Sequence, residues 1–313
     1  MNKNSQFIVF LMGPTASGKT DLAIKLCQQY PFEIISVDSA LIYQQMNIGT
    51  AKPTPEELAL APHALIDFLP PQKSYSVANF RDDALEQIAQ IHQRNHIPLL
   101  VGGTMLYHRA LLYGLSELPS ADEVVREKLL KKYSSEKPTA LHEQLKQCDP
   151  ISADKIHPND PQRILRALEV FELTGQPLSL LQEQSKQMAL KYPHKKIVIA
   201  PKSREELRER IQIRFEQMLA QGFVEEVEQL FQQNDIHADL PSMRCVGYRQ
   251  VWEYLDKQVS YKQMTENAIN ATRQFAKRQM TWLRKEQDAL WLETNHPKNL
   301  ELVVNYLKDF FKR

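Results

Sequence analysis

Apolar residues gather in four short runs along the chain, and the pattern predicts a buried strand for each. The runs cover residues 7–12, 33–37, 98–101 and 196–200. Helical spacing of apolar positions separates the first three runs, and residues 78–93 show it best. Strands that alternate with helices are typical of a parallel sheet with helices on both faces. We therefore expect an α/β fold.

The strand pattern stops over residues 116–195, which are charged, helical in spacing and broken by prolines. It resumes at the fourth run. Two long helices and a last strand are expected beyond this point, over 204–231, 261–285 and 289–293. We expect a discontinuous α/β core, residues 1–115 and 196–313, that carries an all-helical insertion domain at 116–195.

A phosphate-binding loop lies directly after the first strand. Its residues are Gly13, Pro14, Thr15, Ala16, Ser17, Gly18, Lys19 and Thr20. They match G-x-x-x-x-G-K-[ST] in the required strand-then-helix context, as in P-loop NTPases. Loop amides and the positive end of the next helix suit phosphate oxygens, Lys19 would reach the outer phosphates, and Thr20 would ligate Mg²⁺. The loop predicts a ligand with linked phosphates, but it does not separate transfer, hydrolysis and departure as a leaving group.

Asp38 follows the second strand, and ligands of such sheets bind beyond the carboxyl ends of the strands. It is a candidate general base or water-mediated Mg²⁺ ligand; a helix-capping role is the alternative. The third strand ends in Gly102 and Gly103, so the usual ATPase metal aspartate is missing there, which counts against ATP hydrolysis. Arg210 and Arg214 are expected to reach the phosphates from across the cleft.

Three further segments combine cations with features that suit RNA. Arg163 and Arg166 lie one turn apart in a helix expected to begin near Asp160. Residues 244–249 join two arginines, a glycine and a tyrosine, and residues 271–285 carry a basic stripe beside a tryptophan. Each segment taken alone also fits a solvated surface.

Composition narrows the class of protein. The 313 residues carry a net charge of +1, which argues neither for nor against nucleic acid. The three cysteines lie far apart, which excludes a cysteine-based zinc site and indicates a reducing compartment. No apolar run reaches the length of a membrane span, so we expect a cytoplasmic protein. Only nine glycines occur, where average usage would give about 22.

Together these segments resemble the tRNA dimethylallyltransferase family, also called tRNA isopentenyltransferase, in its bacterial form. The resemblance extends to about residue 285. The segments that carry it are 13–20, 38–43, 47–53, 102–107, 118–122, 157–169, 244–249 and 277–284.

The resemblance implies transfer of a dimethylallyl group from dimethylallyl diphosphate to N6 of adenosine 37, beside the tRNA anticodon. Lys19, Thr20 with Mg²⁺, and Arg214 would then stabilise the departing diphosphate. Asp38 would accept the N6 proton, after the base is extruded from the anticodon loop. The partners implied are the tRNA anticodon stem-loop and dimethylallyl diphosphate; we expect a monomer without membrane contact.

The family's RNA contacts, carried over by position, fall on both the core and the insertion. They are Asp38, Ser39, Ala40, Leu41, Thr104, Arg126, Gln162, Arg163, Ile164, Leu165, Arg166, Arg244, Cys245, Val246, Gly247, Tyr248, Arg249, Lys277, Arg278, Gln279, Met280, Thr281, Trp282, Leu283 and Arg284. Eukaryotic members add a zinc finger that has no counterpart here, so zinc is not expected.

Two other classes remain open from the sequence. An adenylate isopentenyltransferase has a similar loop but prenylates free nucleotide, and it would not need the insertion or the basic helix. A small-molecule kinase or a non-catalytic nucleotide-binding module would instead prefer ATP.

Overall fold

A computed structural model of the chain describes residues 6–114, 118–119, 121–133, 140–184 and 189–311. The chain divides into two compact units, Met1–His108 with Lys191–Arg313 and Arg109–Leu190. The expected domain boundary at Ser116 lies outside the described residues, as does Ser120 of the segment at 118–122. Each unit has its own core and is described by itself.

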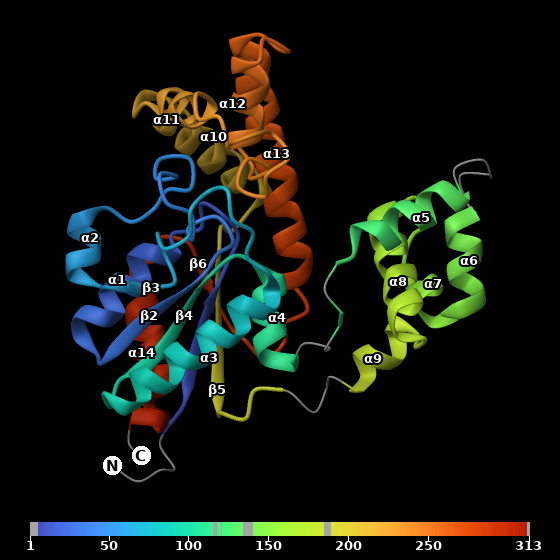
Figure 1. Cartoon of the computed structure of the whole chain (residues 1–313). Helices are drawn as coiled ribbons and strands as arrows, with labels where there is room; N and C mark the ends of the chain where they lie inside the picture. Colours follow the sequence, from blue (N-terminus) through green and yellow to red (C-terminus); the bar gives the residue numbers. More distant parts are fainter. Residues whose placement is uncertain (1–5, 115–117, 120, 134–139, 185–188, 312–313) are drawn as a thin grey trace. The chain divides into compact units, whose positions relative to one another are not determined.

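A parallel six-stranded sheet forms the centre of the first unit (Figure 1). The order across it is β3-β2-β4-β1-β5-β6. The strands are β1 (Ile8–Met12), β2 (Phe32–Val37), β3 (His63–Ala64), β4 (Ile97–Gly102), β5 (His194–Ala200) and β6 (Leu290–Glu293). The α/β class and the five strands expected from the sequence are confirmed, whereas the two-residue β3 was not expected.

Helices surround this sheet. They are α1 (Lys19–Gln29), α2 (Pro55–Leu60), α3 (Val77–Gln93), α4 (Met105–Tyr113), α10 (Arg204–Ala220), α11 (Phe223–Phe231), α12 (Tyr248–Leu255), α13 (Tyr261–Leu283) and α14 (Asn299–Phe311). Figure 1 shows α1 and α14 on one side of the sheet and α3 and α4 on the other.

Strand side chains alternate between these two covered faces. Val9 and Leu11 of β1 belong to the core that contains residues of α1 and α14. Phe10 points to the opposite face, where its ring centroid lies 5.7 Å from that of His108 in α4. Because β1 is buried on both faces, its sequence is a continuous apolar run rather than an alternating one.

Helices α10 to α13 form a second packed layer, visible as the gold and orange helices of Figure 1. Their shared core includes Phe215, Phe223, Tyr248 and Met264, which are all buried. The single helix expected over 204–231 is wrong, because Gly222 takes a left-handed conformation (φ 95°) that ends α10 and begins α11.

The second unit is helical throughout its described elements. These are α5 (Glu123–Tyr133), α6 (Ala140–Cys148), α7 (Pro150–Lys155), α8 (Pro161–Thr174) and α9 (Leu178–Gln184). Asp160 caps α8 and Pro161 is its first residue, as expected. Leu145, Ile164 and Leu168 belong to the core of this unit.

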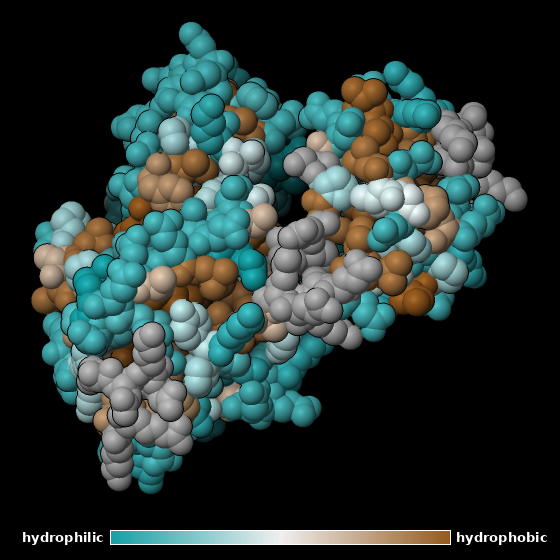
Figure 2. All heavy atoms as spheres, turned by 60° about the horizontal axis from the view of Figure 1, so that its bottom comes forward, coloured by the Kyte–Doolittle hydropathy of each residue, from teal (hydrophilic) through white to brown (hydrophobic). Residues whose placement is uncertain are grey.

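Hydrophilic side chains cover much of the face shown in Figure 2, with hydrophobic patches between them. Among the described helices, none combines the length and the apolar character needed to cross a membrane.

Candidate active site

The phosphate-binding loop joins β1 to α1, as the motif requires. Gly13 passes so close to β5 that an added Cβ would lie 2.3 Å from the carbonyl oxygen of Ile199. Lys19 folds onto the loop, where its Nζ donates to the carbonyl oxygens of Gly13 (2.9 Å) and Pro14 (2.7 Å). The lysine therefore already lies against the cradle that its motif assigns to phosphate.

Two residues from distant helices hold the main chain of this loop. The buried Gln279 of α13 accepts a hydrogen bond from Thr15 N (2.9 Å) and donates one to Gly103 O (2.8 Å). Arg210 of α10 donates from Nε to Ala16 O (2.8 Å). Arg210 thus binds the main chain of the loop, whereas the sequence predicted that it contacts the phosphates.

Asp38 lies at the carboxyl end of β2, as expected, and is half-buried. Its Oδ1 accepts hydrogen bonds from the backbone N–H of Ala40 (2.8 Å) and Leu41 (3.3 Å). Oδ2 makes no hydrogen bond within the described part of the chain. Asp38 therefore caps a turn with one oxygen and keeps the other available for chemistry.

Thr104, just beyond β4, ties this turn to the neighbouring strand. Its Oγ1 accepts a hydrogen bond from Ser39 N (3.1 Å), and its own N–H donates to Val37 O (3.2 Å). The ends of β2 and β4 therefore form one fixed edge beside the phosphate-binding loop.

These groups line a cavity of about 500 Å³ within the first unit. Its polar lining includes Thr15, Asp38, Thr104, Arg214 and Arg278. Its apolar and aromatic lining comes from several elements and includes Tyr43, Gly49, Tyr75, Tyr107, Ile211, Phe215, Met218, Phe223, Tyr248 and Phe275. A cavity of this kind holds an apolar ligand and orients it through a few polar groups.

Burial and neighbouring positive charge lower the pKa values of two cationic side chains in the site. Burial, and then the neighbouring Arg214, lower the pKa of Lys19 to about 7, and Asp38 partly opposes the shift. Burial also lowers the pKa of Arg214, followed by an opposing effect of Asp38. The unliganded site thus holds two desolvated cationic groups close together, which is an arrangement that an anion would stabilise.

Cys245 also lines the cavity, but its thiol is not activated. Burial, followed by the charge of Asp38, raises the pKa of Cys245 to about 12. The side chain therefore stays protonated at neutral pH and acts as an apolar wall rather than as a nucleophile.

The residues at the loop fit the Mg²⁺ expected there. Thr20 lies in the first turn of α1, and its hydroxyl makes no hydrogen bond within the described part of the chain. Among the described residues, no cluster of three His, Cys, Asp or Glu side chains offers a protein-only metal cage. Mg²⁺ commonly binds through few protein ligands and completes its shell with substrate phosphates and water.

A second cavity of about 680 Å³ runs between α10 and α13 in the first unit. Its lining carries six cations and, among the described residues, no carboxylate. They are Lys202, Arg204, Arg208, Arg273, Lys277 and Arg284. We call this feature the basic groove. Such a density of unopposed positive charge favours a polyanion.

The ranges expected to contact tRNA contain side chains that face inward. Ile164 and Leu283 are buried in the cores of their units, and Gln279 is committed to the phosphate-binding loop. Tyr248 is fully buried as well. By contrast, exposed side chains are present at these positions: Ser39, Gln162, Arg163, Arg244, Arg249, Lys277, Arg278, Thr281 and Arg284.

Two arginines of the second unit are held by a buried carboxylate. Glu169 is 0% exposed and pairs with Arg126 (3.0 Å) and Arg166 (2.7 Å). Their guanidinium groups therefore neutralise a charge inside this unit. The sequence treated these arginines as RNA contacts and did not identify Glu169 as their partner, although its spacing of three from Arg166 was a usable signal.

The shifted pKa of Lys19 predicts a proton coupled to anion binding. Above pH 7 the free enzyme has lost much of the charge on Lys19, whereas a bound diphosphate would favour the protonated form. Inorganic diphosphate should therefore bind with uptake of up to about one proton at pH 8 to 9, and its affinity should fall as pH rises.

Calorimetry in buffers with different ionisation enthalpies measures this uptake. Lys19→Arg is the control, because arginine stays charged throughout the range and the protonation of diphosphate itself is common to both proteins. Equal proton uptake by the two proteins would contradict the assignment to Lys19.

Comparison with known proteins agrees with this geometry. The model of the IPP transferase family matches residues 41–286, and that of the isopentenyl transferase family matches residues 6–67. Among solved structures, the Bacillus halodurans tRNA isopentenylpyrophosphate transferase is 34% identical (TM-score 0.72), over 98% of this chain and 97% of that one.

The Staphylococcus epidermidis tRNA Δ(2)-isopentenylpyrophosphate transferase is 36% identical (TM-score 0.70), over 98% of this chain and all of that one (100%). A eukaryotic dimethylallyltransferase acting on tRNA is 26% identical (TM-score 0.84), over 98% of this chain and 80% of that one. The match over residues 41–286 and the identities above 30% across nearly whole chains show that this chain belongs to the IPP transferase family.

Proposed function

We propose that this protein modifies tRNA by transferring a dimethylallyl group from dimethylallyl diphosphate to N6 of adenosine 37, with release of diphosphate. One observation carries the proposal. A single cavity is lined by Asp38, Arg214 and the phosphate-binding loop, and Asp38 Oδ2 accepts no hydrogen bond from the part of the chain that the structure describes. The site thus combines a proton acceptor with an anion cradle, as attack by an amine on an allylic diphosphate requires.

The cradle would stabilise the charge that develops as the C–O bond of the donor breaks. Backbone amides of the loop, Lys19 and Arg214 surround the place where the motif binds phosphates. Preorganised donors and cations aimed at a leaving group often supply the largest share of catalysis. Thr20 would hold Mg²⁺ together with diphosphate oxygens, and the ion would neutralise part of their charge.

Asp38 would act on the other reactant. As N6 forms its bond to the allylic carbon, the nitrogen gains positive charge and its proton passes to Oδ2. The hydrogen bonds from Ala40 and Leu41 to Oδ1 keep this carboxylate oriented. The adenine must leave the anticodon-loop stack to reach the cavity, at an unstacking cost of a few kcal/mol.

The basic groove supplies a surface for RNA phosphates. Lys277 and Arg284, which the family resemblance assigns to tRNA, share it with three cations that the sequence did not single out: Lys202, just before α10, and Arg204 and Arg208 within that helix. In the second unit, Gln162 and Arg163 are exposed on α8 and are offered as further contacts.

The enzyme would act as a monomer in the cytoplasm. The three cysteines are free, which suits a reducing compartment that also holds the tRNA substrate.

A labelled-donor assay tests this function against its alternatives. Dimethylallyl diphosphate labelled in the allyl group is incubated with Mg²⁺ and either tRNA or AMP. Label should enter tRNA that has adenosine at position 37 and not AMP. Label in AMP alone would identify an adenylate prenyltransferase, and ATP consumption without label transfer would identify a kinase.

Replacing Asp38 tests the proton acceptor. Asp38→Asn keeps an oxygen for the N–H groups of Ala40 and Leu41 but removes the basic oxygen, so turnover should fall by roughly 10²–10⁴-fold. The affinity for tRNA, measured separately by filter binding, should change little. Turnover close to that of the wild type would remove Asp38 from the mechanism.

Replacing a groove cation tests the RNA surface. Lys277→Ala should weaken tRNA binding and reduce the slope of log K against log salt by about 1, because one phosphate contact is lost. Lys25→Ala, an exposed lysine on α1, is the charge-matched control and should leave the slope unchanged. Identical slopes for the two variants would indicate that the basic groove is an ordinary solvated surface and not a site for RNA phosphates.

A further inference from the structure

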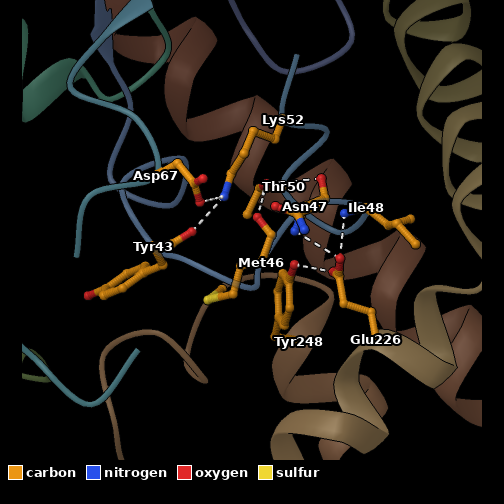
Figure 3. Close-up of polar contacts among 9 residues, drawn as sticks. All are labelled: Tyr43, Met46, Asn47, Ile48, Thr50, Lys52, Asp67, Glu226 and Tyr248. Atoms are coloured by element: carbon orange, nitrogen blue, oxygen red, sulfur yellow. Dashed lines mark hydrogen bonds and ion pairs between the residues drawn. The ribbon is translucent and has the colours of Figure 1, made fainter. Parts of the chain in front are cut away.

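Glu226 of α11 accepts four hydrogen bonds from two separate segments of the chain. Its Oε2 accepts from the backbone N–H of Asn47 (2.8 Å) and Ile48 (2.7 Å). Its Oε1 accepts from Gly49 N (3.2 Å) and from the hydroxyl of Tyr248 (2.6 Å). Figure 3 shows the backbone of Asn47 and Ile48 and the hydroxyl of Tyr248 converging on this carboxylate.

The loop that Glu226 holds is also closed by its own side chains. Thr50 Oγ1 donates to Met46 O (2.7 Å), and Lys52 Nζ donates to Tyr43 O (2.7 Å) and pairs with Asp67 (2.6 Å), as Figure 3 shows. These bonds brace the segment internally, and the four hydrogen bonds to Glu226 tie it to α11 and Tyr248.

This loop forms part of the apolar wall of the catalytic cavity. The wall comprises Gly49, Phe215, Phe223 and Tyr248, all of which line the cavity. The rings of Phe223 and Tyr248 meet edge to face at 5.1 Å. A Cβ added to Gly49 would lie 2.1 Å from Phe223 and 2.6 Å from Tyr248, so the loop backbone rests directly on both rings.

We propose that Glu226 is a positioning residue that fixes this apolar wall and thereby limits the length of the prenyl chain that the cavity accepts. The inference rests on the proposed prenyl transfer. Asp38, Arg214 and the phosphate-binding loop hold the reacting ends of both substrates, so the apolar tail must lie against the remaining lining. A wall held in one position limits the length of the tail that the cavity accommodates.

Only a carboxylate satisfies this arrangement. Each carboxylate oxygen accepts two hydrogen bonds, and all four converging groups are donors. Glutamine offers one accepting oxygen, and its NH₂ group would face two further donors. Glu226→Gln should therefore release the loop, whereas Tyr248→Phe removes one donor only and should have a smaller effect in the same direction.

The test compares dimethylallyl diphosphate with geranyl diphosphate, which is longer by one isoprene unit, at saturating tRNA. In Glu226→Gln the ratio of their kcat/KM values should move toward the longer donor by about tenfold, with a raised KM for dimethylallyl diphosphate and an unchanged KM for tRNA. Glu225→Gln, an exposed neighbour on the same helix, is the matched control. A ratio within about twofold of the control would overturn the proposal.

Hydrogen exchange separates this inference from the proposed function. The amides of Asn47, Ile48 and Gly49 should exchange faster in Glu226→Gln than in Glu225→Gln. Unchanged protection would overturn the positioning role, whatever the prenyl assay gives. A wild-type protein that prenylates tRNA with neither donor would instead remove the proposed function. If Glu226→Gln fails to fold, the donor comparison and the hydrogen-exchange measurement are made on Tyr248→Phe instead.

Discussion

The side chain of Gln279 holds the phosphate-binding loop against the end of β4, and the remaining geometry of the site depends on that contact. Its buried amide group accepts a hydrogen bond from Thr15 N (2.9 Å) and donates one to Gly103 O (2.8 Å). Gly103 is required there, because a Cβ would lie 2.4 Å from Gln279 Nε2. The same helix, α13, presents Lys277 to the basic groove, and its C-cap Arg284 lines that groove as well, so the phosphate-binding loop and the proposed RNA surface share one support.

The strand ends around this contact fit the proposal that the loop binds a leaving group. The strands that flank β1 are β4 and β5, and neither ends in a carboxylate. Asp38 stands one strand further away, at the end of β2, with one oxygen directed to its own turn. A carboxylate at that position is better placed to accept a proton from the second substrate than to hold a metal ion beside an attacking water.

The sequence predicted the parts of this architecture that depend on local pattern. Apolar runs identified strands buried on both faces, and the motif located the loop between β1 and α1. The break at Gly222 was missed because the helical spacing continues across it. Helix α14 was missed although Val303 and Leu307 repeat at helical spacing, a signal that was available.

Contacts between distant segments could not be predicted in the same way. Gln279 was placed within an RNA-binding range, yet its amide is committed 264 residues away in sequence, at Thr15. Glu226 received no role, because its partners at 47–49 come together with it only in the folded chain. The position of Gln279 within a motif thus did not predict the direction in which its side chain points, and no motif included Glu226.

The central claim is that the loop cradles a departing diphosphate while carbon, not phosphorus, is transferred. A donor labelled separately in the allylic carbon and in the terminal phosphorus tests it most directly, with digestion of the tRNA and chromatography of its nucleosides. The account predicts the carbon label on N6 of adenosine 37 and the phosphorus label entirely in free diphosphate. Phosphorus label in the RNA, or carbon label that stays with diphosphate, would contradict it.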